Sequence, residues 1–133
     1  MPALDATEAN RVLSAQLRVA AYSPPAAVYV ALGTTQPTAS TMTTEVAPGA
    51  NAYARQTVAF GTAPSGGTIS STGAATFTNM PATTVNAVEL HGASTGTAVR
   101  LYWQGATQGF AAKTTAAGDT LTFAAGSISA ALT

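Results

Sequence analysis

The chain has 133 residues and a formal net charge of zero, with five basic and five acidic residues. Charged residues make up 8% of the chain, against roughly 25% in an average domain, so no basic stripe is available to bind nucleic acid. The length fits one domain with one core. The absence of cysteine excludes disulfides and cysteine-based metal sites, and no apolar run is long enough to span a membrane.

The scarcity of charge also bears on the class of function. A soluble monomer normally keeps charged side chains on its surface for solubility. Here the polar surface must be made mostly of Thr, Ser, Gln, Asn and backbone groups. Such a surface suits a protein that works inside an assembly, where neighbours cover much of it, better than a free enzyme.

The N-terminal region predicts an amphipathic helix over residues 5–21. Asp5 is a good N-cap, and Glu8 three residues later completes a pair that resembles a capping box. The apolar stripe of this helix consists of Ala9, Val12, Leu13, Leu17 and Ala20. Because such a helix is marginal alone, we expect it to pack on the sheet or on a neighbouring subunit. The acidic residues also stand where a signal peptide would be basic, so we expect none.

Residues 24–32 form the most clearly marked strand. Pro24 and Pro25 stop the preceding element, because proline lacks an N–H group and restricts the residue before it. Apolar side chains then alternate at period two, with Val28, Val30 and Leu32 on one face.

A long loop follows at about residues 33–53. It is rich in threonine and proline and has few large apolar side chains. A loop of this length in a compact domain is usually functional or disordered. We expect it to be a contact arm in an assembly, with Glu45, Tyr53 and Arg55 helping to fix its far end.

Short strands separated by Gly, Pro and Ser turns continue to the end of the chain. We expect them at residues 55–61, around Ile69 and Phe77, and at 85–91, 98–103, 121–123 and 128–132. The turn at residues 92–96 is short, so the strands on either side of it should form a hairpin. In the second of these strands, alternation places Val99, Leu101 and Trp103 on one face and Arg100 and Tyr102 on the other.

These elements predict a mainly β protein with a single domain over residues 1–133. The helix over residues 5–21 precedes an antiparallel β-sandwich or jelly-roll-like domain of about eight short strands over residues 24–133. The predicted core consists of Val28, Val30, Leu32, Val58, Phe60, Ile69, Phe77, Val88, Leu90, Val99, Leu101, Trp103, Leu121, Phe123, Ile128 and Leu132.

One stretch matches a catalytic motif in form. Residues 92–96 fit G-x-S-x-G, with Ser94 as the nucleophile and His91, the only histidine, just before it. That motif requires a helix after the turn and a histidine later in the chain, whereas here a strand follows. His91 could instead act as a general base with Glu89, but a polar residue at a strand end is the simpler interpretation. We therefore predict no enzyme activity, no catalytic, cofactor-binding or metal-binding residues, and no cofactor.

The aromatic residues allow a second hypothesis. They could form a carbohydrate-binding face, whose distinguishing feature would be an exposed cluster of Tyr102 with Tyr53. Packing in the core and at interfaces explains them more simply, and we favour it. The residues in question are Tyr22, Tyr29, Tyr53, Tyr102 and Trp103.

The run from Tyr22 to Thr38, which contains the sequence Pro-Pro-Ala-Ala-Val-Tyr-Val-Ala-Leu-Gly, carries a resemblance that continues through residues 45–60. Closing motifs follow at residues 101–105 and 117–126. Together they resemble a group of small virion proteins of tailed bacteriophages, often named tail fibre proteins. At residues 89–93 the chain departs from that group, which has a more hydrophobic stretch followed by an acidic turn.

The resemblance implies a structural protein of a phage virion. With the low charge, the single β-domain and the long loop, it favours a capsid decoration protein that binds the outside of the major capsid lattice and stabilises it. The helix and residues 33–53 would make the contacts. The alternative is a tail fibre or tail-tip component that adsorbs to a host glycan or protein. Expected partners are the major capsid protein and copies of the chain itself, as a dimer or trimer. A host receptor is a partner only under the alternative, and no nucleic acid or membrane is expected.

Overall fold

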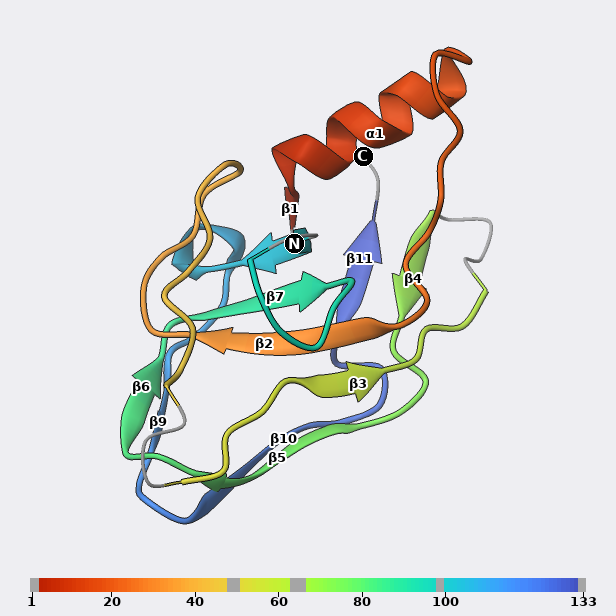
Figure 1. Ribbon diagram of the computed structural model, residues 1–133. Helices are drawn as coiled ribbons and strands as arrows, with labels where there is room; N and C mark the ends of the chain where they lie inside the picture. The colour runs from red at the N-terminus through yellow and green to blue at the C-terminus, as the bar shows by residue number, and fades with distance from the viewer. Residues whose placement is uncertain (1–2, 48–50, 63–66, 98–99, 132–133) are drawn as a thin grey trace.

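The computed structural model describes residues 3–47, 51–62, 67–97 and 100–131. Their regular secondary structure is mainly antiparallel strands, with one α-helix near the N-terminus, which confirms the predicted fold class (Figure 1). No helix in these ranges is long and apolar enough to cross a membrane.

The central element is a five-stranded antiparallel sheet. Its strand order is β1 (Ala3–Leu4), β8 (Arg100–Gln104), β7 (Ala87–His91), β2 (Val28–Gly33) and β3 (Gln56–Val58). The pairing of β7 with β8 confirms the predicted hairpin, and β2 occupies an interior position between β7 and β3.

Three antiparallel strand pairs complete the sandwich-like arrangement. In Figure 1 the longest of them, β5 with β10, runs beneath β3. A short 3-10 helix, η1 (Ala106–Gln108), follows β8. The pairs are β5 (Ala75–Met80) with β10 (Asp119–Phe123), β4 (Thr68–Ser70) with β11 (Ser129–Ala131), and β6 (Thr83–Val85) with β9 (Lys113–Thr115).

The expected strand at residues 85–91 is two strands that join different sheets. β6 pairs with β9, whereas β7 pairs with β2 and β8. Asn86 lies between them, where its N–H donates to the Gly33 carbonyl at 2.8 Å and its Nδ2 donates to the Thr34 carbonyl at 2.8 Å. These two bonds fix the point at which the chain leaves one sheet for the other.

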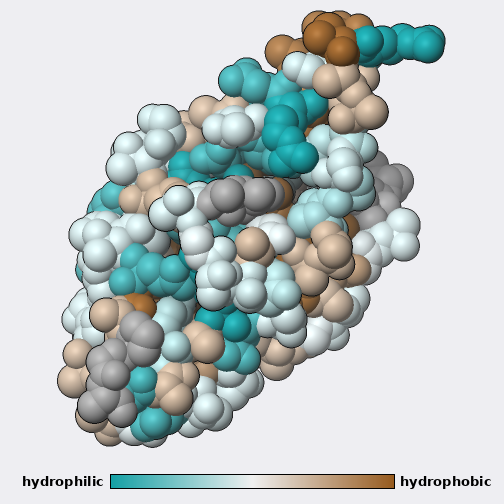
Figure 2. All heavy atoms as spheres, viewed as in Figure 1, coloured by the Kyte–Doolittle hydropathy of each residue, from teal (hydrophilic) through white to brown (hydrophobic). Residues whose placement is uncertain are grey.

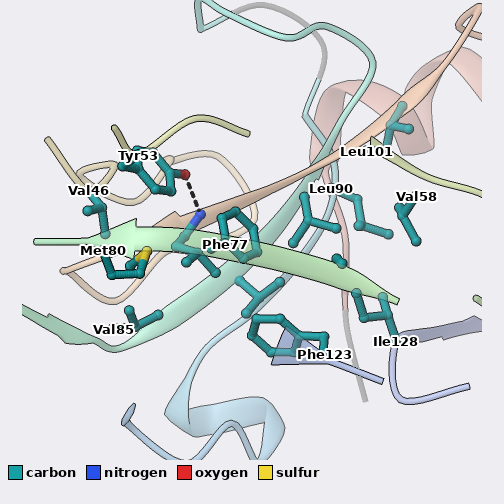
Figure 3. Packing of buried hydrophobic residues seen from close by; sticks show 14 residues of the cluster. Val46, Tyr53, Val58, Phe77, Met80, Val85, Leu90, Leu101, Phe123 and Ile128 are labelled. Carbon is teal, nitrogen blue, oxygen red and sulfur yellow. Dashed lines mark hydrogen bonds between the residues drawn. The ribbon is translucent and has the colours of Figure 1, made fainter. Parts of the chain in front are cut away.

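The apolar core lies between the central sheet and the β5–β10 pair (Figure 3). The Phe77 ring is stacked against Tyr53 with ring centroids 5.8 Å apart, and it meets Phe123 edge-on at 6.2 Å. Predicted core residues that are buried are Val30, Leu32, Val58, Phe77, Val88, Leu90, Leu101, Trp103, Phe123 and Ile128.

The other predicted core residues are half-buried or lie outside the described residues. Val28, Phe60 and Leu121 are half-buried against the core cluster, and Ile69 is half-buried outside it. Val99 and Leu132 lie outside the described residues. The core also includes buried residues that alternation did not select, namely Val46, Tyr53, Ala75, Met80 and Val85.

A β-bulge changes the predicted facing of β8. Tyr102 pairs with Leu90 and Arg100 pairs with His91, so Leu101 is an extra residue on its strand. Leu101 and Tyr102 consequently both pack with the apolar core, whereas Arg100 is buried among polar groups. The predicted strict alternation was therefore wrong for this strand.

The helix α1 (Ala6–Gln16) is shorter than the predicted residues 5–21. Asp5 caps it as expected, since the Thr7 N–H donates to Asp5 Oδ1 at 2.9 Å. The predicted apolar stripe is largely uncovered: 53% of Leu13 and 67% of Leu17 are exposed, and Glu8 is the buried residue of this helix. In Figure 1 the helix projects from the body at the end of β1. Of the two covers that the sequence predicted for this stripe, the sheet does not reach its C-terminal end, and a neighbouring subunit remains a prediction.

The loop after β2, which the sequence predicted to be a contact arm, is held against the protein itself along its described residues. Glu45 forms an isolated bridge with Gly33, and the buried Val46 donates its N–H to the Leu32 carbonyl at 2.9 Å. The loop can approach β2 this closely because Gly33 has no Cβ: a Cβ there would lie 2.0 Å from Thr43 Oγ1.

We therefore expect Gly33→Ala to lower the free energy of unfolding by about 1–3 kcal/mol, because the added methyl group must displace the Thr43 loop. Gly73→Ala is the matched control, since a Cβ there meets no atom within 4 Å. Denaturant unfolding measures both changes. Equal stability of the two variants would contradict the close packing of the loop on β2.

Candidate functional site

Buried charges meet where α1, β7 and β8 come together. Arg100 is 4% exposed, and its Nε and Nη2 donate to Asp5 Oδ2 at 2.9 and 2.6 Å. Its Nη1 donates to Glu89 Oε1 at 3.0 Å. One cation thus connects the helix N-cap to the hairpin, and it neutralises charge on two buried carboxylates that would be costly to leave unpaired.

The same guanidinium holds the loop after β2. Its Nη1 donates to the Thr41 carbonyl at 2.8 Å and its Nη2 donates to the Thr38 carbonyl. The Thr43 N–H donates to Glu89 Oε1 at 2.8 Å. All five N–H groups of Arg100 therefore have partners within the protein, which leaves none to bind a ligand.

His91 and Glu89, which the sequence suggested as a possible acid–base pair, do meet. His91 Nε2 lies 3.0 Å from Glu89 Oε2, and both side chains are fully buried. Ser94 is in the exposed turn between β7 and β8 and shares no hydrogen bond with His91 among the described atoms. The strand–turn–helix geometry of a nucleophile elbow is not formed here.

A second ion pair fixes the far end of the loop, where the sequence predicted it. Arg55 Nε and Nη2 donate to the two oxygens of Glu45 at 2.9 and 2.7 Å, and the Tyr53 hydroxyl donates to Glu45 Oε1 at 3.0 Å. Arg55 also donates to the Ala93 and Gly96 carbonyls at 3.0 and 2.8 Å, which joins the loop to the β7–β8 turn.

The environment shifts the ionisation of this group. Burial raises the pKa of Glu45, but the hydrogen bonds from Arg55 and Tyr53 outweigh burial and hold that pKa below its ordinary value. Burial likewise raises the pKa of the Tyr53 hydroxyl. The ionised carboxylate and the neutral phenol are thus the forms that fasten the loop.

A third cluster secures the chain as it returns from the helix. The Tyr22 hydroxyl donates to Glu8 Oε1, and Arg11 Nη1 donates to Glu8 Oε2 at 2.8 Å. The Arg11 guanidinium also lies 5.4 Å from the centre of the Tyr22 ring and donates to the Ser23 carbonyl at 3.1 Å. Burial, followed by the hydrogen bond to Glu8, raises the pKa of Tyr22 to about 12.

Beside this cluster lies an apolar surface that nothing within the described chain covers. Leu13, Leu17, Val19 and Tyr22 are 53%, 67%, 77% and 39% exposed, and they are the exposed large hydrophobic residues of the described ranges. In Figure 2 hydrophobic atoms gather at the projecting tip where α1 ends. Exposed apolar side chains gathered in this way mark an interaction surface.

A groove of about 400 Å³ runs beside that surface, between α1 and β8. Its walls are mostly apolar and include both Tyr22 and Tyr102. Burial raises the pKa of Tyr102 in this groove. The groove is lined by Leu4, Glu8, Val12, Ala15, Gln16, Tyr22, Leu101 and Tyr102.

The structure separates the tyrosines considered for carbohydrate binding. Tyr53 is 7% exposed, because its ring stacks on Phe77 and its hydroxyl accepts the Leu32 N–H at 2.9 Å (Figure 3). Tyr102 lies in the groove beside α1. These two residues therefore do not form the exposed aromatic cluster that the sequence allowed.

No group of three or more His, Cys, Asp or Glu side chains among the described residues could hold a metal ion. The charged side chains that come together are instead paired with one another. The site that remains open to a partner is the apolar one formed by the end of α1 and the groove beside it. Sequence periodicity selected Leu13 and Leu17 and predicted that the sheet or a neighbouring subunit covers them, whereas Val19 and Tyr22 lie outside the stripe that it selected.

The sequence matches the protein family described as Podophage GP4 fiber I protein gp80 over residues 3–131. The match includes the helix, the central sheet and the strand pairs. A search of curated proteins gave no match.

We expect Arg100→Met to lower the free energy of unfolding by about 3–5 kcal/mol, because Asp5 and Glu89 would keep buried charges without their cation. Lys113→Met is the control, since Lys113 is exposed and the substitution should change stability by about 0.5 kcal/mol or less. Urea unfolding of the three proteins gives the comparison. A loss below about 1 kcal/mol for Arg100→Met would contradict the role of this cation.

The ionisation of Tyr22 predicts a change at high pH. Its pKa is raised in the folded protein from 10.0 to about 12, so its contribution to stability is present below pH 10 and is lost as the pH rises from 10 to 12. Tyr22→Phe should therefore remove part of the fall in unfolding free energy over that range. Tyr29→Phe leaves the bond to Glu8 intact and should retain the fall, as pH-dependent thermal unfolding would show.

Proposed function

The chain belongs to the Podophage GP4 fiber I protein gp80 family, and on that premise we propose that it is a structural subunit of a fibre on the virion of a tailed phage. The observation that carries the proposal is the family match, which extends over residues 3–131. From the sequence alone, capsid decoration is the preferred role and a tail fibre or tail-tip component is the alternative. The family description favours the second of these.

The physical character of the molecule supports a structural role. The ion pairs of Arg100 and Arg55 fasten the start of the helix, the loop after β2 and the β7–β8 turn to one sheet. A third pair, Arg11 with Glu8, holds the chain that returns from the helix. With a net charge of zero and 8% charged residues, the surface offers little electrostatic repulsion to a neighbouring subunit. The exposed apolar residues at the end of α1 supply the hydrophobic area that a stable contact needs.

Host adsorption through a sugar has less support in the geometry than a role in building the fibre. Aromatic platforms for sugars need exposed ring faces, and the ring of Tyr53 is taken up by the core. The subunit would act by joining virion proteins to one another. Its partners would be further fibre components or copies of itself.

Localisation on purified particles tests this function. Antibody-gold labelling and cryo-electron microscopy of intact phage should place the protein in a fibre, and particles that lack it should lose that fibre while their heads keep their resistance to heat. Regular density over the icosahedral shell, or heads that become heat-sensitive without the protein, would overturn the fibre assignment in favour of capsid decoration.

A further inference from the structure

The segment that follows β2 is a hairpin whose two legs are joined by its own threonines. We define residues 34–44 as the arm, which is the narrow hairpin after β2 in Figure 1. The Thr34 N–H donates to the Thr44 carbonyl at 2.8 Å, and the Thr44 N–H donates to Thr35 Oγ1 at 2.7 Å. The Thr43 hydroxyl donates to the Thr35 carbonyl at 2.6 Å. None of these bonds needs a partner from the sheets, so the legs can stay together when the arm moves.

The arm is attached to the rest of the protein through polar contacts. The Arg100 guanidinium donates to two of its carbonyl groups, and Glu89 Oε1 accepts the Thr43 N–H at 2.8 Å. Pro37 and Thr43 are the buried residues of the arm, and its one large apolar side chain, Met42, is half-buried. Arm groups that bond to the body belong to Thr34, Gln36, Thr38, Ala39, Thr41 and Thr43.

An ion pair, which we call the latch, stands where the arm returns to the sheet. Glu45 follows the arm directly, and its carboxylate accepts hydrogen bonds from Arg55 at 2.9 and 2.7 Å and from the Tyr53 hydroxyl at 3.0 Å. Arg55 also donates to the Ala93 and Gly96 carbonyls of the β7–β8 turn. The Glu45 side chain is 34% exposed, so a proton from solvent can reach its carboxylate.

We propose that the arm opens from the body as one unit while the sheets stay paired, and that the ionised Glu45 carboxylate holds it closed. Opening breaks the bonds to Arg100 and Glu89 and retains those between the legs. Segments with few buried apolar contacts open more readily than a packed core. The open arm would be the contact arm that the sequence predicted for this loop. This device goes beyond the fibre function and does not depend on it.

Acid should loosen the latch. Burial raises the pKa of Glu45, but the hydrogen bonds from Arg55 and Tyr53 outweigh burial, so that pKa lies below its ordinary value of 4.5. The contribution of Glu45 to closure is therefore complete above pH 4.5 and is lost as the pH falls through the folded pKa. Two further titratable groups face the latch from β7: His91 acts on Glu45, and Glu89 acts on Arg55.

Hydrogen exchange of single amides in the full chain, followed by NMR, tests the proposal. The Thr43 N–H bonds to Glu89 and the Ala6 N–H bonds to the Ala39 carbonyl, so one opening of the arm exposes both. Their opening equilibrium constants should therefore coincide. The Thr34 N–H, which bonds across the legs, should exchange more slowly, and the paired amides of β2 and β7 should stay protected.

Glu45→Gln removes the charge of the latch and keeps the size of the side chain. At pH 7 it should raise the opening constant at Thr43 and Ala6 on the order of 10-fold, because hydrogen bonds to a charged group are stronger than those to a neutral one. Lowering the pH of the wild type from 7 to about 3 should raise the same constant, and the variant should show less of this rise.

Glu8→Gln is the matched control. Glu8 also accepts hydrogen bonds from an arginine and a tyrosine, Arg11 and Tyr22, but it lies outside the arm. This variant should leave the opening constant at Thr43 unchanged. An equal rise at Thr43 in the two variants would overturn the assignment of Glu45, since any lost ion pair would then have the same effect.

Three other results would contradict the device. Different opening constants at Thr43 and Ala6 would overturn the opening of the arm as one unit. Loss of protection in β2 and β7 in step with the arm would mean that the arm opens only when the sheet unfolds. An unchanged constant at Thr43 in Glu45→Gln would remove the latch. None of these measurements depends on where the protein lies on the virion, so the arm and the fibre assignment can fail separately.

Discussion

The buried contact of Arg100 with Asp5 and Glu89 is the interaction on which the arrangement of the molecule depends. It joins the start of the helix to the hairpin of the central sheet, across 95 residues of sequence in the case of Asp5. The guanidinium also binds two backbone carbonyls of the loop after β2. A single planar cation with five donors can hold three chain segments in one fixed geometry, which a flexible ammonium group could not do as well.

Most of the few acidic residues in this chain form ion pairs within the protein. Four of the five acidic residues, Asp5, Glu8, Glu45 and Glu89, are in ion pairs with Arg11, Arg55 or Arg100. The pairs of Arg55 and Arg100 fasten segments to the sheet, and the pair of Arg11 with Glu8 holds the chain that returns from the helix. Charges paired in this way contribute little to solubility. The outer surface is left to neutral polar and small apolar residues, which suits a subunit with neighbours on several sides.

The β-sheet body of the molecule is closely packed, whereas the end of the helix is exposed. The sheet, its loop and its hairpin are closed by packing and ion pairs, and the charged groups of Glu89 and Arg100 have their partners inside the protein. The C-terminal half of α1 stands away from this body and leaves its apolar side chains in solvent. A fixed body with one apolar projection is the physical form expected of a subunit that assembles through a defined contact.

The sequence alone determined the features that depend on local order. Period-two alternation identified β2 and most of the core, and Asp5 identified the start of the helix. The short turn at residues 92–96 identified the hairpin, and an ordered set of motifs indicated a phage virion protein. Only the tertiary structure decided the bulge at Leu101, the burial of Tyr53 and the placement of the loop against β2. Strand register and the pairing of charges far apart in sequence arise from long-range packing, which leaves no periodic signal in the chain. The exposure of Leu17 was hidden for the same reason, because an apolar stripe shows that a helix face must be covered but not which molecule covers it.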